Sequence, residues 1–169
     1  FGLRAGQLAR PGIFHALGLG IVSSTSVLAA LRRIVRYSSV VSTNGRLVLI
    51  LEGPQASLET RRTELTIVPC AQYFDAVVVT VCRILRLCAG PTAIPTLVTL
   101  PYQSDVPPAA YQEAIGCPVE FGADRCTLKF DAELAARAVL TGNPELAAEA
   151  DRMAARYIEG LAPDTAATR

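Results

Sequence analysis

The sequence predicts an α+β fold, in which helices pack on a mostly antiparallel sheet and a helix near the C-terminus serves dimerisation. Short apolar stretches bounded by turn residues indicate strands, and longer segments with apolar residues every three or four positions indicate helices. The 169 residues are 51% hydrophobic and only 18% charged, which suits one core that needs no disulfide or metal.

The N-terminal part predicts one clear helix. Gly2–Arg10 resembles the end of a helix that stops at a proline and a glycine. Gly12–Ser23 is apolar, but Gly18 and Gly20 disfavour a stable helix, so a short buried strand or an irregular hairpin is expected there. Serine and threonine residues then offer caps for a helix over about residues 26–39.

The middle of the chain predicts a hairpin followed by a long helix. Arg46–Glu52 alternates apolar residues on both faces, which is typical of a central strand. A polar loop is expected from Gly53, with Thr63–Val68 as the returning strand. A helix over about Cys70–Cys88 follows, and Ile94–Leu100 is a further strand.

The last third predicts two short strands between helices. A short helix ends at Gly116, and strands are expected at Pro118–Phe121 and Cys126–Asp131. Ala132–Leu140 is expected to be helical. Asn143 can cap a final helix that starts at a proline and runs to about residue 161.

The residues do not suggest an enzyme, a metal site or a cofactor. His15 is the single histidine, and no cysteine pair has the spacing of a zinc site. The five cysteines are an odd number, which favours reduced, buried thiols and a cytoplasmic location. Cys117 acting with His15 remains open, so the alternative function is a small cysteine-dependent enzyme. A third possibility is an interaction module with no effector.

Charge and hydropathy restrict the partners. A net charge of +1 is too balanced for a fragment whose main task is to bind nucleic acid. No window of about 20 residues is strongly apolar and uncharged, so no membrane span is expected.

The final predicted helix has an apolar stripe that suits assembly. Leu146, Ala150, Met153 and Tyr157 recur at spacings of three and four, with charged residues beside them. This stripe either packs on its own domain or forms a homodimer seam, and we expect the seam.

A phrase in the last third resembles the N-terminal effector-binding and dimerisation region of AraC-type (AraC/XylS family) bacterial transcription regulators. The phrase has the form aromatic-x-x-x-x-G-C-P-V-x-F-G-A, then L-x-F-D and N-P-E-L. Its residues here are Tyr111, Gly116, Cys117, Pro118, Val119, Phe121, Gly122, Ala123, Leu128, Phe130, Asp131 and Asn143 to Leu146.

The resemblance implies a division of the chain and a set of partners. Residues 1–142 would be an effector-sensing α+β domain that lacks the first residues of the family. Residues 143–169 would be a helix and linker towards an absent helix-turn-helix domain, so DNA would be bound only through that missing part. The effector would be amino-acid-like or lipid-like. Cys126 and Val139 stand where many members have asparagine and proline.

The effector is expected to bind in a pocket between the sheet and two helices, Val27–Val41 and Cys70–Cys88. The two-sided apolar strand Arg46–Glu52 needs cover on both faces, and a sensor would use one cover as a lid. The candidate polar contacts are His15, Tyr37, Tyr73 and Thr80.

Overall fold

A computed structural model describes residues 1–41, 45–62 and 69–161. The helices are α1 (Gly2–Gln7), the short 3₁₀ helix η1 (Pro11–Phe14), α2 (His15–Val22), α3 (Val27–Val41), α4 (Ala71–Ala89), α5 (Pro108–Ile115), α6 (Ala132–Ala136) and α7 (Pro144–Leu161). The strands are β1 (Gly45–Glu52), β2 (Gln55–Arg62), β3 (Leu97–Leu100), β4 (Val119–Phe121) and β5 (Thr127–Phe130).

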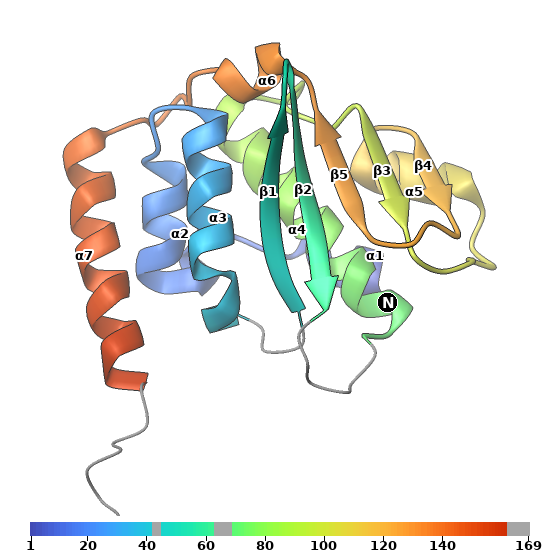
Figure 1. Ribbon diagram of the computed structural model, residues 1–169, viewed down its shortest axis with the longest axis horizontal. Coiled ribbons are helices and arrows are strands. Elements are labelled where there is room, and N and C mark those ends of the chain that lie inside the picture. Colours follow the sequence, from blue (N-terminus) through green and yellow to red (C-terminus); the bar gives the residue numbers. More distant parts are fainter. Residues whose placement is uncertain (42–44, 63–68, 162–169) are drawn as a thin grey trace, which may run out of the picture.

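The five strands form one sheet in the order β1-β2-β5-β3-β4 (Figure 1). Three neighbouring pairs are antiparallel, and only β3 and β4 run parallel. The predicted α+β class with a mostly antiparallel sheet is therefore confirmed.

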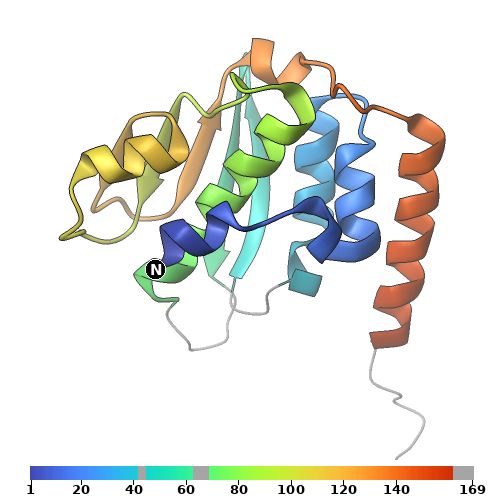
Figure 2. The same cartoon turned by 180° about the vertical axis from the view of Figure 1, so that it is seen from behind.

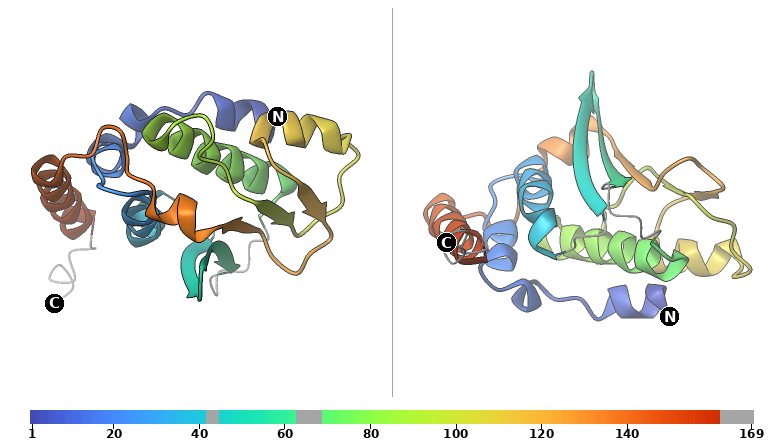
Figure 3. Two further views of the ribbon diagram at one scale, coloured as in Figure 1. Left: turned by 90° about the horizontal axis from the view of Figure 1, so that it is seen from above. Right: turned by 60° about the horizontal axis from the view of Figure 1, so that its bottom comes forward.

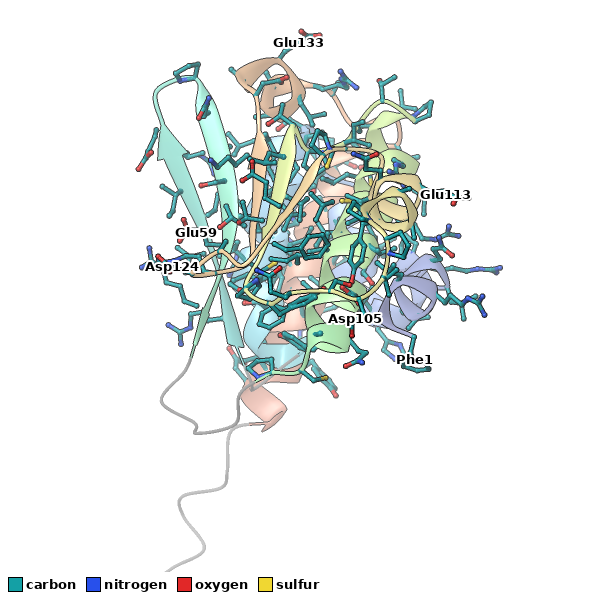
Figure 4. All side chains as sticks on the ribbon, turned by 90° about the vertical axis from the view of Figure 1, so that its right-hand side faces the viewer. Phe1, Glu59, Asp105, Glu113, Asp124 and Glu133 are labelled. Carbon is teal, nitrogen blue, oxygen red and sulfur yellow. The ribbon has the colours of Figure 1, made fainter. Side chains whose placement is uncertain are left out.

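α1, α4 and α5 lie on one side of the sheet, α3 runs beside its β1 edge, and α6 lies at the end of the strands (Figure 1). α4 crosses behind the strands, and α1 packs on the far side of α4 (Figure 2). α2 and α3 continue this layer towards α7, while α5 lies at the opposite end of the molecule (Figure 3). The other side of the sheet carries polar groups such as Glu59 and Asp124 (Figure 4), and Arg125 forms an ion pair with Glu59 at 3.3 Å.

The core lies between the sheet and α4. Leu58, Leu128 and Val98 are in register across β2, β5 and β3, and all three are fully buried. On α4, Val78 and Leu85 are fully buried as well. These side chains fix the distance between the two layers and hold α4 beneath the strands.

The expected strand or hairpin over Gly12–Ser23 was wrong, because this segment forms the end of η1 and the helix α2. Gly18 is a position of close packing, and Gly20 faces α7. A β-carbon on Gly18 would lie 1.7 Å from the backbone oxygen of Pro11, and one on Gly20 would lie 3.4 Å from Cβ of Ala150. Tertiary contacts thus override the low helix propensity of glycine.

β1 corrects the expectation of a central strand, because it lies at one edge of the sheet. Its unpaired edge runs beside α3, where the Leu47 N–H donates to Ser38 Oγ at 3.4 Å. The expected loop from Gly53 was also wrong, since β2 begins at Gln55 after a two-residue turn. The predicted strand Thr63–Val68 lies outside the described residues.

Other elements differ from the predictions mainly at their ends. β3 begins at Leu97 instead of residue 94, and α6 ends at Ala136 instead of residue 140 because Ala138 pairs with Ser26. Both predicted caps are confirmed: Ser26 Oγ accepts from the Ala29 N–H at 3.2 Å, and Asn143 Oδ1 accepts from the Leu146 N–H at 3.0 Å. Of the described helices, none has the length and apolar character needed to span a membrane.

Candidate functional site

A cavity of about 320 Å³ lies where α2, α3, α4 and β1 meet. It occupies the place expected for a pocket, between the sheet and the two long helices. Its walls are Phe14, Leu17, Ile21, Ile34, Ser38, Gly45, Leu47, Tyr73, Ala76, Val77, Thr80, Val81 and Ile84. We refer to it as the first cavity.

The helical repeat of α4 presents Tyr73, Val77 and Thr80 to the first cavity on one face. The polar side chains in its wall are hydroxyl groups, and none of the described lining residues carries a formal charge. Ser38 donates to the Val35 carbonyl at 2.9 Å, within its own helix. Such a lining suits an apolar ligand that has few hydrogen-bonding groups.

A second cavity of about 630 Å³ lies between the start of α2 and the C-terminal half of α7. Phe14 and Leu17 line both cavities, so these two side chains form the wall between them. The second cavity is lined by Ile13, Phe14, His15, Ala16, Leu17, Tyr37, Met153, Ala154, Tyr157 and Ile158.

The four predicted ligand contacts are divided between the cavities. Tyr73 and Thr80 line the first cavity, whereas His15 and Tyr37 line the second. The Tyr37 hydroxyl donates to Asp151 Oδ1 at 3.1 Å. Burial, followed by this hydrogen bond, raises the pKa of Tyr37 above its usual value.

The predicted dimer stripe on α7 also divides. Ala150 is buried against α2, with only 1% of its surface exposed. Leu146, Met153 and Tyr157 remain 40%, 48% and 61% exposed. The face of α7 that meets its own domain therefore lies next to an exposed apolar stripe.

An ion pair that the sequence does not predict joins α3 to α7. Arg33 Nε and Nη2 donate to the two carboxylate oxygens of Asp151 at 3.2 and 3.0 Å. Arg33 also donates to Ser24 Oγ at 3.0 Å. In the sequence Arg33 belongs to an arginine cluster that is typical of a solvated helix face, and its partner lies 118 residues away. A single sequence does not reveal which distant acid will form an ion pair with a given arginine.

The cysteines are free thiols, and Cys70 alone among them is exposed. Burial raises the pKa of Cys117 to about 11, with a smaller opposing effect of Arg86. A nucleophilic cysteine needs a lowered pKa. Cys117 follows α5 and His15 begins α2, and these helices lie towards opposite ends of the molecule (Figure 3). Within the described ranges, no group of acidic, histidine and cysteine side chains suits a metal ion.

The residues of the sequence phrase form a scaffold. Gly116, at φ 88°, ends α5 in the left-handed conformation that glycine adopts without strain. Arg86 on α4 donates to the last carbonyls of α5, at 3.3 Å for Ala114. The rings of Tyr111 and Phe121 pack edge to face, with their centroids 4.9 Å apart. The phrase therefore joins α5 to the sheet and touches neither cavity.

The fold is similar to that of a solved transcription regulator. The crystal structure of transcriptional regulator CdpR from Pseudomonas aeruginosa matches 88% of this chain and 49% of its own, with a TM-score of 0.72 and 16% identity. At this identity the match shows the fold alone.

Curated relatives and a family pattern give a more specific result. HTH-type transcriptional regulator VirS, from two strains of Mycobacterium tuberculosis, is 29% identical over 163 residues. The match includes 94% of this chain and 46% of VirS, so the chain spans about half the length of these relatives. The family described as the arabinose-binding domain of AraC transcription regulator, N-terminal, matches residues 1–139. The chain therefore belongs to this family of AraC-type N-terminal domains.

Proposed function

We propose that the chain senses a small effector in the first cavity and passes the signal to the DNA-binding part of a longer AraC-type regulator. In this proposal residues 1–142 form the sensing domain, and residues 143–169 form a helix and linker. The match to the arabinose-binding domain of AraC-type regulators supports this proposal. The observation that carries the proposal is the apolar first cavity, which is lined by residues of three helices and the edge strand β1.

The effector is a small, uncharged and largely apolar molecule. Of the two classes that the resemblance implies, the lining favours a lipid-like molecule over an amino-acid-like one. The ammonium and carboxylate groups of an amino acid would lose their hydration and meet no charged partner among the described lining residues. Among the hydroxyl groups of the lining, that of Thr80 can orient a polar atom of the ligand, whereas the Ser38 hydroxyl already binds Val35 and Leu47.

A thermal-shift screen tests the effector class. Neutral fatty alcohols and hydrocarbons should raise the melting temperature, whereas amino acids and polyamines should not. Val77→Phe, which places a ring in the first cavity, should reduce the shift. Leu87→Phe on the same helix is the matched control, because Leu87 is 51% exposed and lies outside the cavity. An equal shift in both variants would place the ligand elsewhere.

The domain itself is proposed to have no catalytic activity. The relatives and the family are transcription regulators, and the raised pKa of Cys117 keeps its thiol protonated near neutral pH. Iodoacetamide at pH 7.5 should modify the exposed Cys70 first. Fast and selective alkylation of Cys117 would instead support the cysteine-dependent enzyme.

The regulator is proposed to form a homodimer through α7. Ala150 is buried against α2 and is therefore not available to a partner. The proposed seam consists of Leu146, Met153 and Tyr157. Sedimentation of Leu146→Asp and Met153→Asp should show monomers, and Ala148→Asp, an exposed position on another face of α7, should stay dimeric. Folded Leu146→Asp and Met153→Asp dimers would place the seam elsewhere.

We propose that another part of the longer regulator, and not this chain, binds DNA. The regulator is proposed to act in the cytoplasm. The net charge of +1 gives little attraction to phosphates, and the free cysteines fit a reducing compartment. A gel shift at low salt should detect no binding by the isolated chain. Submicromolar, salt-sensitive binding would contradict this.

A further inference from the structure

We propose that α7 is the output element of the first cavity: a ligand in that cavity tightens the attachment of α7 to α2 and α3. This inference rests on the proposed function of the cavity. It adds a route by which occupancy reaches the helix that leads out of the domain.

The first connection runs through α2. Phe14 and Leu17 line the first cavity on one side and the second cavity, beside α7, on the other. One turn further along, Gly20 faces Ala150 of α7, where an added β-carbon would make an ordinary van der Waals contact with Cβ of Ala150 at 3.4 Å. A displacement of α2 away from the cavity therefore changes its contact with α7 directly.

The wall that holds Phe14 moves together with α2. η1 folds back on α2 so closely that a β-carbon on Gly18 would lie 1.7 Å from the Pro11 carbonyl oxygen. η1 and α2 thus form one packed unit between the first cavity and α7.

The second connection runs through α3. Ile34 and Ser38 line the first cavity, and the residues that precede them on the helix, Arg33 and Tyr37, bind Asp151 of α7. The guanidinium of Arg33 meets both carboxylate oxygens, a two-point contact that fixes direction as well as distance. Asp151 is therefore bound by α3, and the neighbouring residues Ile34 and Ser38 of the same helix line the first cavity.

The direction of the effect follows from packing. A ligand in the first cavity would add van der Waals contacts to Phe14, Leu17 and Ile21, so it would hold α2 more firmly. The same contacts with Ile34 would limit the motion of α3. Because coupling between two sites is reciprocal, weakening the attachment of α7 must also weaken binding in the cavity.

N-phenyl-1-naphthylamine, a neutral apolar fluorophore, can serve as the probe in this experiment. Binding is measured by fluorescence, and the attachment of α7 by amide hydrogen exchange of peptides within residues 144–158. In the unchanged chain the probe should slow exchange in α7. Asp151→Ala should weaken probe binding about fivefold, although Asp151 does not line the first cavity.

Glu149→Ala is the matched control, because Glu149 is also an acid on α7 but pairs with the exposed Arg152. Its probe affinity should equal that of the unchanged chain. Tyr37→Phe removes only the hydroxyl that binds Asp151, and should weaken the probe less than Asp151→Ala does. It also provides a test if Asp151→Ala fails to fold.

Val77→Phe separates the two proposals. The added ring occupies part of the first cavity beside Phe14 and Leu17, so it should hinder the probe and slow exchange in α7 without any ligand. Absence of probe binding to the unchanged chain would overturn the proposed apolar effector site. Probe binding that leaves exchange in α7 and the affinity of Asp151→Ala unchanged would overturn the output role of α7 alone.

Discussion

At the residue scale, Gly18 decides the shape of the wall between the two cavities. The carbonyl oxygen of Pro11 occupies the place where a side chain would begin, at 1.7 Å from an ideal β-carbon. Glycine thus allows η1 to fold onto α2 and brings Phe14 to both cavities. Glycine has a low helix propensity, but at position 18 the wall between the two cavities requires it.

Gly18→Ala should therefore lower the free energy of unfolding by about 3 kcal/mol or more, because the new methyl group meets backbone that cannot rotate away. Gly12→Ala is the control, since an added β-carbon there has no atom within 4 Å. It should change stability by less than about 1 kcal/mol. Urea unfolding of both variants measures the difference. Equal stability of the two variants would contradict the close packing of η1 on α2.

His15, which lines the second cavity, carries backbone strain. Its φ of 50° and ψ of −130° are rare for any residue with a side chain. His15→Gly should therefore stabilise the domain by about 1 kcal/mol. His15→Ala keeps a β-carbon and should give no such gain. Thermal unfolding decides this, and an equal effect of both changes would mean that the imidazole, and not the backbone, sets the difference.

At the element scale, α4 organises its neighbours through arginines on its outer face. Arg83 donates to the Ala9 carbonyl just after α1, at 2.7 Å. Arg86 donates to Ala114 and Ile115 at the end of α5. Carbonyl groups at helix ends lack partners within their helix and carry partial negative charge, so a cation satisfies both needs.

Arg86→Met should cost about 1.5–3 kcal/mol, because the change removes charged hydrogen bonds and leaves buried carbonyls without their donor. The matched control is Arg152→Met on α7, whose exposed ion pair with Glu149 should contribute less than about 1 kcal/mol. Urea unfolding measures both values. A similar small loss in the two variants would show that Arg86 does not hold α5.

At the scale of the whole molecule, buried thiols make stability depend on pH. Burial is the first cause that raises the pKa of Cys82 and Cys126 to about 12 and that of Cys88 and Cys117 to about 11, from an ordinary value of 9.0. Between pH 9 and about pH 11–12 the thiols of the unfolded chain release protons that the same thiols retain in the folded chain. The stabilising effect is complete below pH 9 and is lost as pH rises towards 11–12.

The free energy of unfolding should thus fall between pH 9 and 10.5, by about 1 kcal/mol per pH unit for each buried thiol. Urea titrations at pH 8, 9 and 10 under reducing conditions measure this slope. Cys82→Ala should reduce the slope, whereas Cys70→Ser should not, because Cys70 is exposed. A slope unaffected by Cys82→Ala would assign the pH dependence to other groups.

The sequence by itself determined the elements that local interactions define. The apolar period of α3, α4 and α7 follows from side chains three and four residues apart, and the caps at Ser26 and Asn143 act within one turn. Gly116 stops α5 for an equally local reason. The family phrase correctly indicated an AraC-type domain, although its residues build the scaffold and not the cavity.

The tertiary structure alone decided what depends on contacts between distant residues. Two glycines that disfavour a helix locally became part of α2, because Gly18 packs closely on Pro11 and Gly20 faces Ala150 of α7. β1 took an edge position because the order of strands is a property of the whole sheet. His15 and Tyr37 were separated from Tyr73 and Thr80 by the wall that α2 forms, and the pairing of α3 with Asp151 spans more than one hundred residues. A residue's own sequence neighbourhood contains none of these contacts, so they follow only from the packed fold.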